Sequence, residues 1–171
     1  MEQDIDLFLS IAEMAGVFVA FGALISVARD RTDQDPLQLR GVIGVVMIGL
    51  VVLVAALLPV ALARYGLTGR ALWGWSSGGF LLLIWVAISR LLLDPEHGEW
   101  MKGDARSHPA ITVFFWIFLE APIQIPLALA ILGVAPALAP AFYVTALVLY
   151  LLEAAFVLAR LVFSRAPRAG R

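Results

Sequence analysis

The amino-acid sequence predicts an all-α polytopic membrane protein with five transmembrane helices, and three observations support this fold class. Hydrophobic residues make up 62% of the 171 residues and charged residues 15%, whereas soluble proteins contain about 45–50% and about 25%. The apolar residues form five long runs, which short polar or helix-breaking segments separate. Within each run the apolar residues are continuous rather than alternating, which favours helices over the strands of a membrane barrel.

Five candidate spans follow one another along the chain. Each is close to the roughly 20 apolar residues that cross a hydrocarbon core of about 30 Å as a helix. The spans are Leu7–Ala28, Gly41–Ala63, Leu72–Leu93, Ala110–Leu132 and Ala141–Phe163. Because no repeat or long linker divides the chain, we expect residues 1–171 to form one transmembrane helical-bundle domain.

The second and fourth spans follow residues that commonly start a helix. Asp35 before Pro36 is typical of an N-cap and a first-turn proline, which places the start of the second helix before its apolar run. Ser107, His108 and Pro109 predict a similar start for the fourth helix.

The third span is the least regular, because it opens with a polar, glycine-rich stretch, Leu72–Gly79. The spacing of Gly74 and Gly78 favours close packing against another helix, and a helix break that lines a polar cavity is the alternative. The last two spans are kept separate, since Gly133 and Pro136 between them interrupt a helix.

The distribution of Lys and Arg predicts the orientation. Of the 12 basic residues, only Arg64 and Arg70 fall on the side of the N-terminus. The others fall on the opposite side: Arg29, Arg31, Arg40, Arg90, Lys102, Arg106, Arg160, Arg165, Arg168 and Arg171. Since basic residues accumulate on the cytoplasmic side, the N-terminus is expected outside and the C-terminus in the cytoplasm.

Three glutamates, Glu13, Glu120 and Glu153, lie within apolar spans, where ionisable groups are costly and are functional candidates by default. At about 1.5 Å of rise per residue, Glu120 and Glu153 both lie about 15 Å from the cytoplasmic ends of their spans. A short loop joins these two helices, which are therefore expected to be antiparallel neighbours whose carboxyl groups can meet. Glu13 lies about 22 Å from the cytoplasmic end of its span, nearer the outside.

The neighbours of Glu120 and Glu153 add polar groups at the same depth. Gln124 follows Glu120 by one helical turn, and Pro122 and Pro126 each remove a backbone donor, which predicts a broken polar turn at mid-membrane. On the fifth span, Glu153 shares a stripe with Tyr150.

On the first span, the stripe through Glu13 contains Gly16 and Ala20. Small residues of this kind let membrane helices approach closely. We therefore expect Glu13 to face protein rather than lipid.

These observations predict a pathway for protons or cations. No Lys or Arg lies near mid-membrane, so the carboxyl groups lack a basic partner; burial favours their protonated form, and one proton can be shared between two of them. The residues assigned to the pathway are Glu120, Gln124, Glu153, Tyr150 and, nearer the outer mouth, Glu13.

Five helices leave little room for a pore within one chain. We therefore expect a homo-oligomeric channel or transport subunit, in which an aqueous path forms between subunits. The expected location is the inner membrane of a bacterium, and the expected partners are the lipid bilayer, further copies of the chain and a proton or cation.

The alternative is a structural or accessory membrane subunit, whose glutamates only make interhelical hydrogen bonds. An enzyme is not expected, and no catalytic residue, metal or cofactor is assigned, because the spans contain no His, Cys, Asp or Lys and the chain has no catalytic motif. His97 and His108 share an acidic loop, but their spacing matches no metal-ligand motif, which favours a solvated loop. The net charge of −1 excludes a binder of nucleic acid that works by neutralising phosphates.

Overall fold

The computed structural model describes residues 2–27, 36–93, 113 and 116–163. Nearly all of these residues are helical and none of them forms a strand, which confirms the all-α fold class. The elements are α1 (Glu2–Val27), α2 (Pro36–Arg64), α3 (Gly69–Leu93), the π-helix η1 (Trp116–Glu120), α6 (Ala121–Leu132), the 3₁₀ turn η2 (Pro136–Leu138) and α7 (Ala139–Phe163). Asp35, His97, Ser107, His108 and Pro109 lie outside the described residues.

Four of the described helices are long and apolar enough to cross a membrane. The apolar segments are Ile5–Ile25, Gly41–Arg64, Gly69–Leu91 and Pro136–Ala159. They agree with four of the five predicted spans, which fits a multi-pass membrane protein. The described part of the remaining span, Ile117–Leu132, is a shorter apolar helix, roughly 24 Å long at about 1.5 Å per residue. A fifth crossing therefore stays a prediction.

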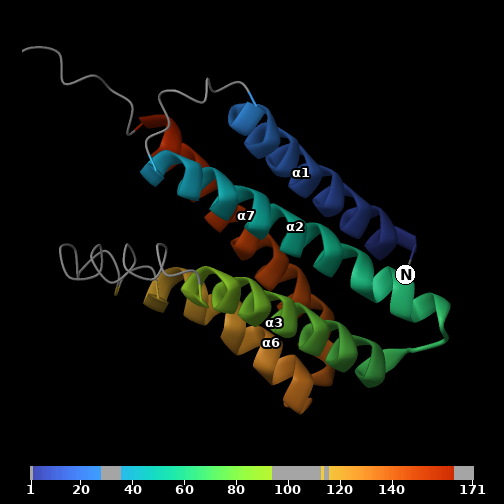
Figure 1. Ribbon diagram of the computed structural model, residues 1–171. Coiled ribbons are helices and arrows are strands. Elements are labelled where there is room, and N and C mark those ends of the chain that lie inside the picture. The colour runs from blue at the N-terminus through green and yellow to red at the C-terminus, as the bar shows by residue number, and fades with distance from the viewer. Residues whose placement is uncertain (1, 28–35, 94–112, 114–115, 164–171) are drawn as a thin grey trace, which may run out of the picture.

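The helices form a bundle in which neighbours along the chain run in opposite directions (Figure 1). Helices α2, α3, α6 and α7 pack in a ring, with α2 against both α3 and α7 and α6 against the same two helices. Helix α1 lies outside this ring and packs mainly on α2. The N-terminus, the α2–α3 turn and the α6–α7 turn lie at the same end of the bundle, called the N-terminal end below (Figure 1).

Helix α1 packs on α2 through a different stripe from the predicted one. Its buried residues include Phe8, Ile11 and Ala15. The two helices approach closely at Gly49, where an added Cβ would lie 2.8 Å from Val19 Cγ2 and 3.3 Å from the carbonyl oxygen of Ala15, and at Gly22, where it would lie 2.5 Å from Val46 Cγ2. The predicted contact is wrong for Ala20, which is exposed, whereas Gly16 is half-buried and a Cβ on it would make an ordinary van der Waals contact with Leu53 at 4.0 Å.

The glycine-rich start of α3 is continuous helix, so the predicted alternative of a helix break there is wrong. A Cβ on Gly74 or Gly78 would meet no described atom within 4 Å, whereas one on Gly79 would lie 3.0 Å from Leu58 of α2. Within the described residues, the α2–α3 contact therefore uses Gly79 and leaves the Gly74–Gly78 face uncovered.

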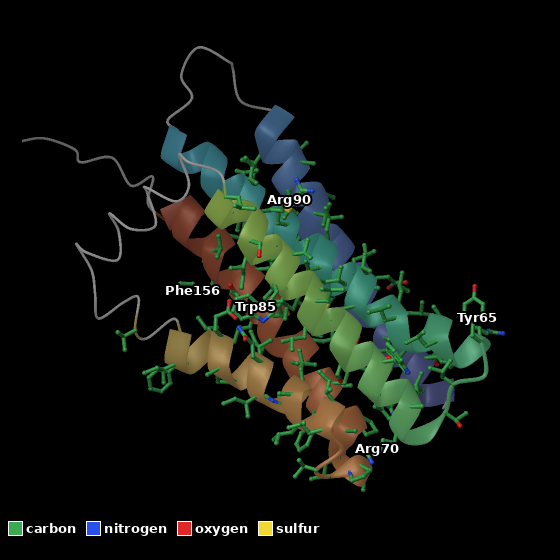
Figure 2. The ribbon with its side chains drawn as sticks, turned by 60° about the horizontal axis from the view of Figure 1, so that its bottom comes forward. Tyr65, Arg70, Trp85, Arg90 and Phe156 are labelled. Atoms are coloured by element: carbon green, nitrogen blue, oxygen red, sulfur yellow. The ribbon has the colours of Figure 1, made fainter. Side chains whose placement is uncertain are left out.

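The chain reverses between α6 and α7 at Gly133, whose φ of 69° is in the left-handed region. The Gly133 N–H donates to the carbonyl oxygens of Leu129 and Ala130, as is common at helix C-termini. The Arg70 guanidinium at the start of α3 donates to the carbonyl oxygen of Leu132 at 3.1 Å and fills the space that a Cβ on Gly133 would need. Figure 2 shows Arg70 at this end of the bundle.

Candidate functional site: a buried carboxyl pair

Glu120 and Glu153 are both inside the bundle, each only 4% exposed. Glu120 is the last residue of η1, and Glu153 lies on α7, which packs against η1 and α6. The two carboxyl groups lie close enough to interact electrostatically with each other, and both interact with the Tyr150 hydroxyl. The structure thus brings together three of the residues that the sequence assigns to a pathway.

The position of Glu120 follows from the local sequence. The helix is π-wound over Trp116–Glu120 and becomes α-helical at Ala121, directly before Pro122. Proline has no backbone N–H to donate to the preceding turn, and π-turns of this kind commonly lie at functional sites. The winding therefore changes at Pro122, whereas α6 continues through Pro126, so the helix is rewound rather than broken.

Gln124 joins the site from the same helix as Glu120. Its side-chain nitrogen donates a hydrogen bond of 2.8 Å to a carboxylate oxygen of Glu120. This confirms the predicted pairing one turn apart. The amide therefore holds the Glu120 carboxyl group on the side of the helix that faces α7.

Glu153 is the less satisfied of the two glutamates. Among the described residues, its Oε2 atom is buried and has no hydrogen-bond partner. Tyr150, one turn earlier on α7, is 3% exposed, and its ring packs edge-on against Phe80 of α3 with centroids 5.8 Å apart. This ring contact holds Tyr150 within electrostatic range of Glu153, although no hydrogen bond joins its hydroxyl to Oε2.

Among the residues that the structure describes, the charged and polar neighbours of the pair are acidic or neutral. The electrostatic partner of Glu153 is Glu120, and Glu120 has the Gln124 amide. In the described ranges no cluster of three or more His, Cys, Asp or Glu residues could hold a metal ion. The arrangement can hold a shared proton, or a monovalent cation between two carboxylates, without any further basic group.

Two further polar residues, both on α3, are buried and were not assigned from the sequence. Ser76 and Ser77 are fully buried, and neither hydroxyl has a hydrogen-bond partner within the described part of the chain. Ser76 follows Leu72 and precedes Phe80 at intervals of four residues, and both of these are buried. This helical spacing is the signal that could have placed Ser76 on the inner face.

Glu13 does not join the pair. It is exposed on α1, about two residues beyond the buried Ile11, which places it on the opposite side of a helix with 3.6 residues per turn. The expectation that Glu13 faces protein is therefore wrong for the single chain. The stripe of small residues suggested a contact, but the larger buried residues of α1 determine which face meets α2.

An aromatic cluster fills the bundle between the pair and the N-terminal end. The rings of Phe8, Trp73, Tyr143, Phe80 and Tyr150 contact one another in sequence, with centroids 5.7–6.1 Å apart. The Tyr143 hydroxyl donates a hydrogen bond of 2.7 Å to the carbonyl oxygen of Ala55. The cluster links α1, α3 and α7, and its tyrosine is anchored to α2.

Comparison with known proteins gives no functional assignment. No protein-family model, curated protein or solved structure matches this chain. The geometry of the buried pair is therefore the basis for a functional proposal.

Proposed function

We propose that this chain is a subunit that conducts protons or cations across a membrane through a site formed by Glu120, Gln124, Glu153 and Tyr150. The observation that carries the proposal is the burial of two interacting carboxyl groups inside an apolar bundle. Two ionised carboxylates at this depth repel each other and lack hydration, which is costly. A proton or a cation bound between them relieves both problems, so the site has affinity for a mobile positive species.

The contacts of the pair support transfer as well as binding. The Gln124 amide stabilises an acceptor oxygen of Glu120, and the Tyr150 hydroxyl lies near both carboxyl groups. A hydroxyl can donate and accept a proton. Tyr150 is therefore suited to pass a proton between the pair and the aromatic side of the bundle.

Proton flux into proteoliposomes tests the proposal. Under an imposed membrane potential, we expect Glu120→Gln and Glu153→Gln to slow acidification of the lumen, measured with a pH-sensitive dye, by at least about tenfold, the effect of a barrier higher by about 1.4 kcal/mol. Glu13→Gln is the matched control, because it makes the same chemical change at an intramembrane position outside the pair. The control is expected to conduct like the unmodified chain.

The opposite outcome would favour a structural subunit. If both variants of the pair conduct like the unmodified chain but unfold at lower temperature in detergent, the glutamates only stabilise helix contacts. Glutamine removes the charge that either a proton or a metal cation needs, so the variants alone do not identify the conducted species. Repeating the assay with a sodium or potassium gradient distinguishes a cation pathway from a proton pathway.

We further propose that the chain forms a homo-oligomer in the inner membrane of a bacterium, with its N-terminus outside. The orientation is supported by the accumulation of basic residues at the end of the bundle opposite the N-terminus. The oligomer is supported by the exposed Glu13, because intramembrane carboxyl groups almost always face other protein or a water-filled cavity. A neighbouring copy against the outward face of α1 would cover Glu13.

A further inference from the structure

The outward face of α3 carries a groove that the proposed pathway does not use. The groove has a volume of about 370 Å³ and is lined by Leu82, Trp85, Val86, Ser89, Arg90 and Leu93. In Figure 2 the side chains of Trp85 and Arg90 extend to opposite flanks of this face. The groove is therefore a shallow trough along one helix, with an aromatic ring on one flank and a cation on the other.

The polar groups of the groove are gathered towards one end of the helix. Ser89 and Arg90 lie in the last turns of α3, where the apolar segment ends at Leu91. Both are exposed, and no hydrogen bond or ion pair joins Arg90 to another residue of the described ranges. Since the apolar segment ends at the membrane surface, the guanidinium lies at the level of the lipid headgroups.

The rest of the groove extends into the membrane. Leu82 lies about 12 Å from Arg90 along the helix and Gly78 about 18 Å, at about 1.5 Å per residue. These lengths match one leaflet of a hydrocarbon core, which is about 15 Å thick. At Gly78 a Cβ would meet no described atom within 4 Å, so the surface stays open to that depth.

We propose that this groove binds an anionic phospholipid, with the phosphate at Arg90 and Ser89 and one acyl chain along Val86 and Leu82. A guanidinium and a hydroxyl together suit a phosphate, since Arg forms charge-assisted, often bidentate, hydrogen bonds to its oxygens. The positive charge that would pair with the phosphate lies at the Arg90 end of the groove, and the apolar part is about as long as one leaflet. The shape and the polarity of the groove therefore match a lipid. A second protein helix would not need a cation at one end only.

Lipid titration of the purified protein tests this site. In a neutral detergent, phosphatidylglycerol is expected to raise the unfolding temperature more than phosphatidylcholine does. Arg90→Gln should abolish the difference in unfolding temperature between the two lipids and raise the apparent Kd for phosphatidylglycerol about tenfold. Arg90→Lys keeps a positive charge and should keep part of that temperature difference. Arg64→Gln is the matched control, because Arg64 is also exposed at a helix end but lies at the other end of the bundle.

Two further measurements separate the lipid from other occupants. Val86→Trp fills the groove without changing its charge and should weaken phosphatidylglycerol binding, and inorganic phosphate alone should leave the unfolding temperature unchanged. The proposal is overturned if Arg90→Gln and Arg64→Gln respond alike to phosphatidylglycerol. It is also overturned if phosphate alone reproduces the shift, or if Val86→Trp changes the oligomer size and not the lipid affinity.

Discussion

Gly133 shows how one residue determines the end of a helix and a contact between two helices. Its positive φ closes the C-terminus of α6, and the absence of a side chain leaves room for the Arg70 guanidinium. Arg70 in turn donates to the carbonyl oxygen of Leu132, which has no partner within its own helix. The α6–α7 turn is thus tied to the start of α3 by a cation at the negative end of a helix dipole.

Gly133→Ala is expected to destabilise the protein by about 1–2 kcal/mol, the cost of the left-handed conformation for a residue with a Cβ. The added methyl group also displaces Arg70. Gly74→Ala is the control, because Gly74 is helical and has open space around it, and it should leave the stability unchanged or raise it by up to about 1 kcal/mol. The free energy of unfolding in detergent measures both changes; equal values for the two variants would contradict this account.

At the same scale, the sequence was sufficient to select Glu120, Gln124 and Glu153, because a carboxyl group in an apolar span is conspicuous and helical rise gives its depth. It was not sufficient for Glu13. Depth follows from counting residues along one helix, whereas the direction of a side chain depends on which neighbouring helix covers which face. The sequence of α1 alone does not contain that information.

The pairing of α1 with α2 is the clearest element-scale feature, and it includes close approaches at Gly49 and Gly22. A side chain at Gly49 would collide with Val19 and with the backbone of Ala15. Elsewhere the ring of α2, α3, α6 and α7 holds itself together, since each of these helices packs on two others. Helix α1 is therefore attached mainly through its long contact with α2, together with the ring contacts of Phe8 to Trp73 and Tyr143.

Gly49→Leu should separate α1 from α2 and lower the stability by about 1–3 kcal/mol, the usual cost of overpacking. Gly44→Leu is its matched control on the same helix, because a Cβ on Gly44 would meet no described atom within 4 Å. Proteolysis in detergent checks the result: cleavage within α1 should become faster in the first variant only. Faster cleavage in both would show that α2 itself is disturbed.

The elements themselves were largely predictable. The lengths of the apolar runs place α1, α2, α3 and α7 within a few residues of their observed ends. The π-turn before Pro122 was not predictable in its form, because the two prolines show only where backbone donors are missing. Whether the helix breaks or rewinds there depends on what packs around it.

For the whole molecule, the sequence predicted the membrane crossings and two neighbouring helices whose carboxyl groups can meet. It did not show whether a single chain would bury both groups. The expectation of a path between subunits was based on the little room that five helices leave for a pore within one chain. In the structure, Glu120 and Glu153 are buried by their own chain, and the exposed carboxyl group is Glu13. The proposed pathway and the proposed subunit contact therefore involve different glutamates.

This separation gives a whole-molecule prediction. Glu13→Leu should weaken the homo-oligomer about tenfold in its dissociation constant, which corresponds to the loss of about 1–2 kcal/mol for a polar contact between membrane helices. Glu13→Gln keeps a hydrogen-bonding group and should keep the oligomer, as should Met14→Leu at the neighbouring exposed position. Single-molecule photobleaching in vesicles counts the subunits, and an unchanged count for Glu13→Leu would remove Glu13 from the interface.

The packed rings between Tyr150 and Phe8 limit access to the carboxyl pair from the N-terminal end of the bundle. Because each ring packs at an angle on the next and Tyr143 is anchored to Ala55, one ring cannot rotate far unless its neighbours rotate too. Hydration from the N-terminal end then requires several side chains to move in concert, which is slower than the rotation of an isolated ring. Water or ions entering from that end would therefore reach the carboxyl pair only as fast as these rings can move together.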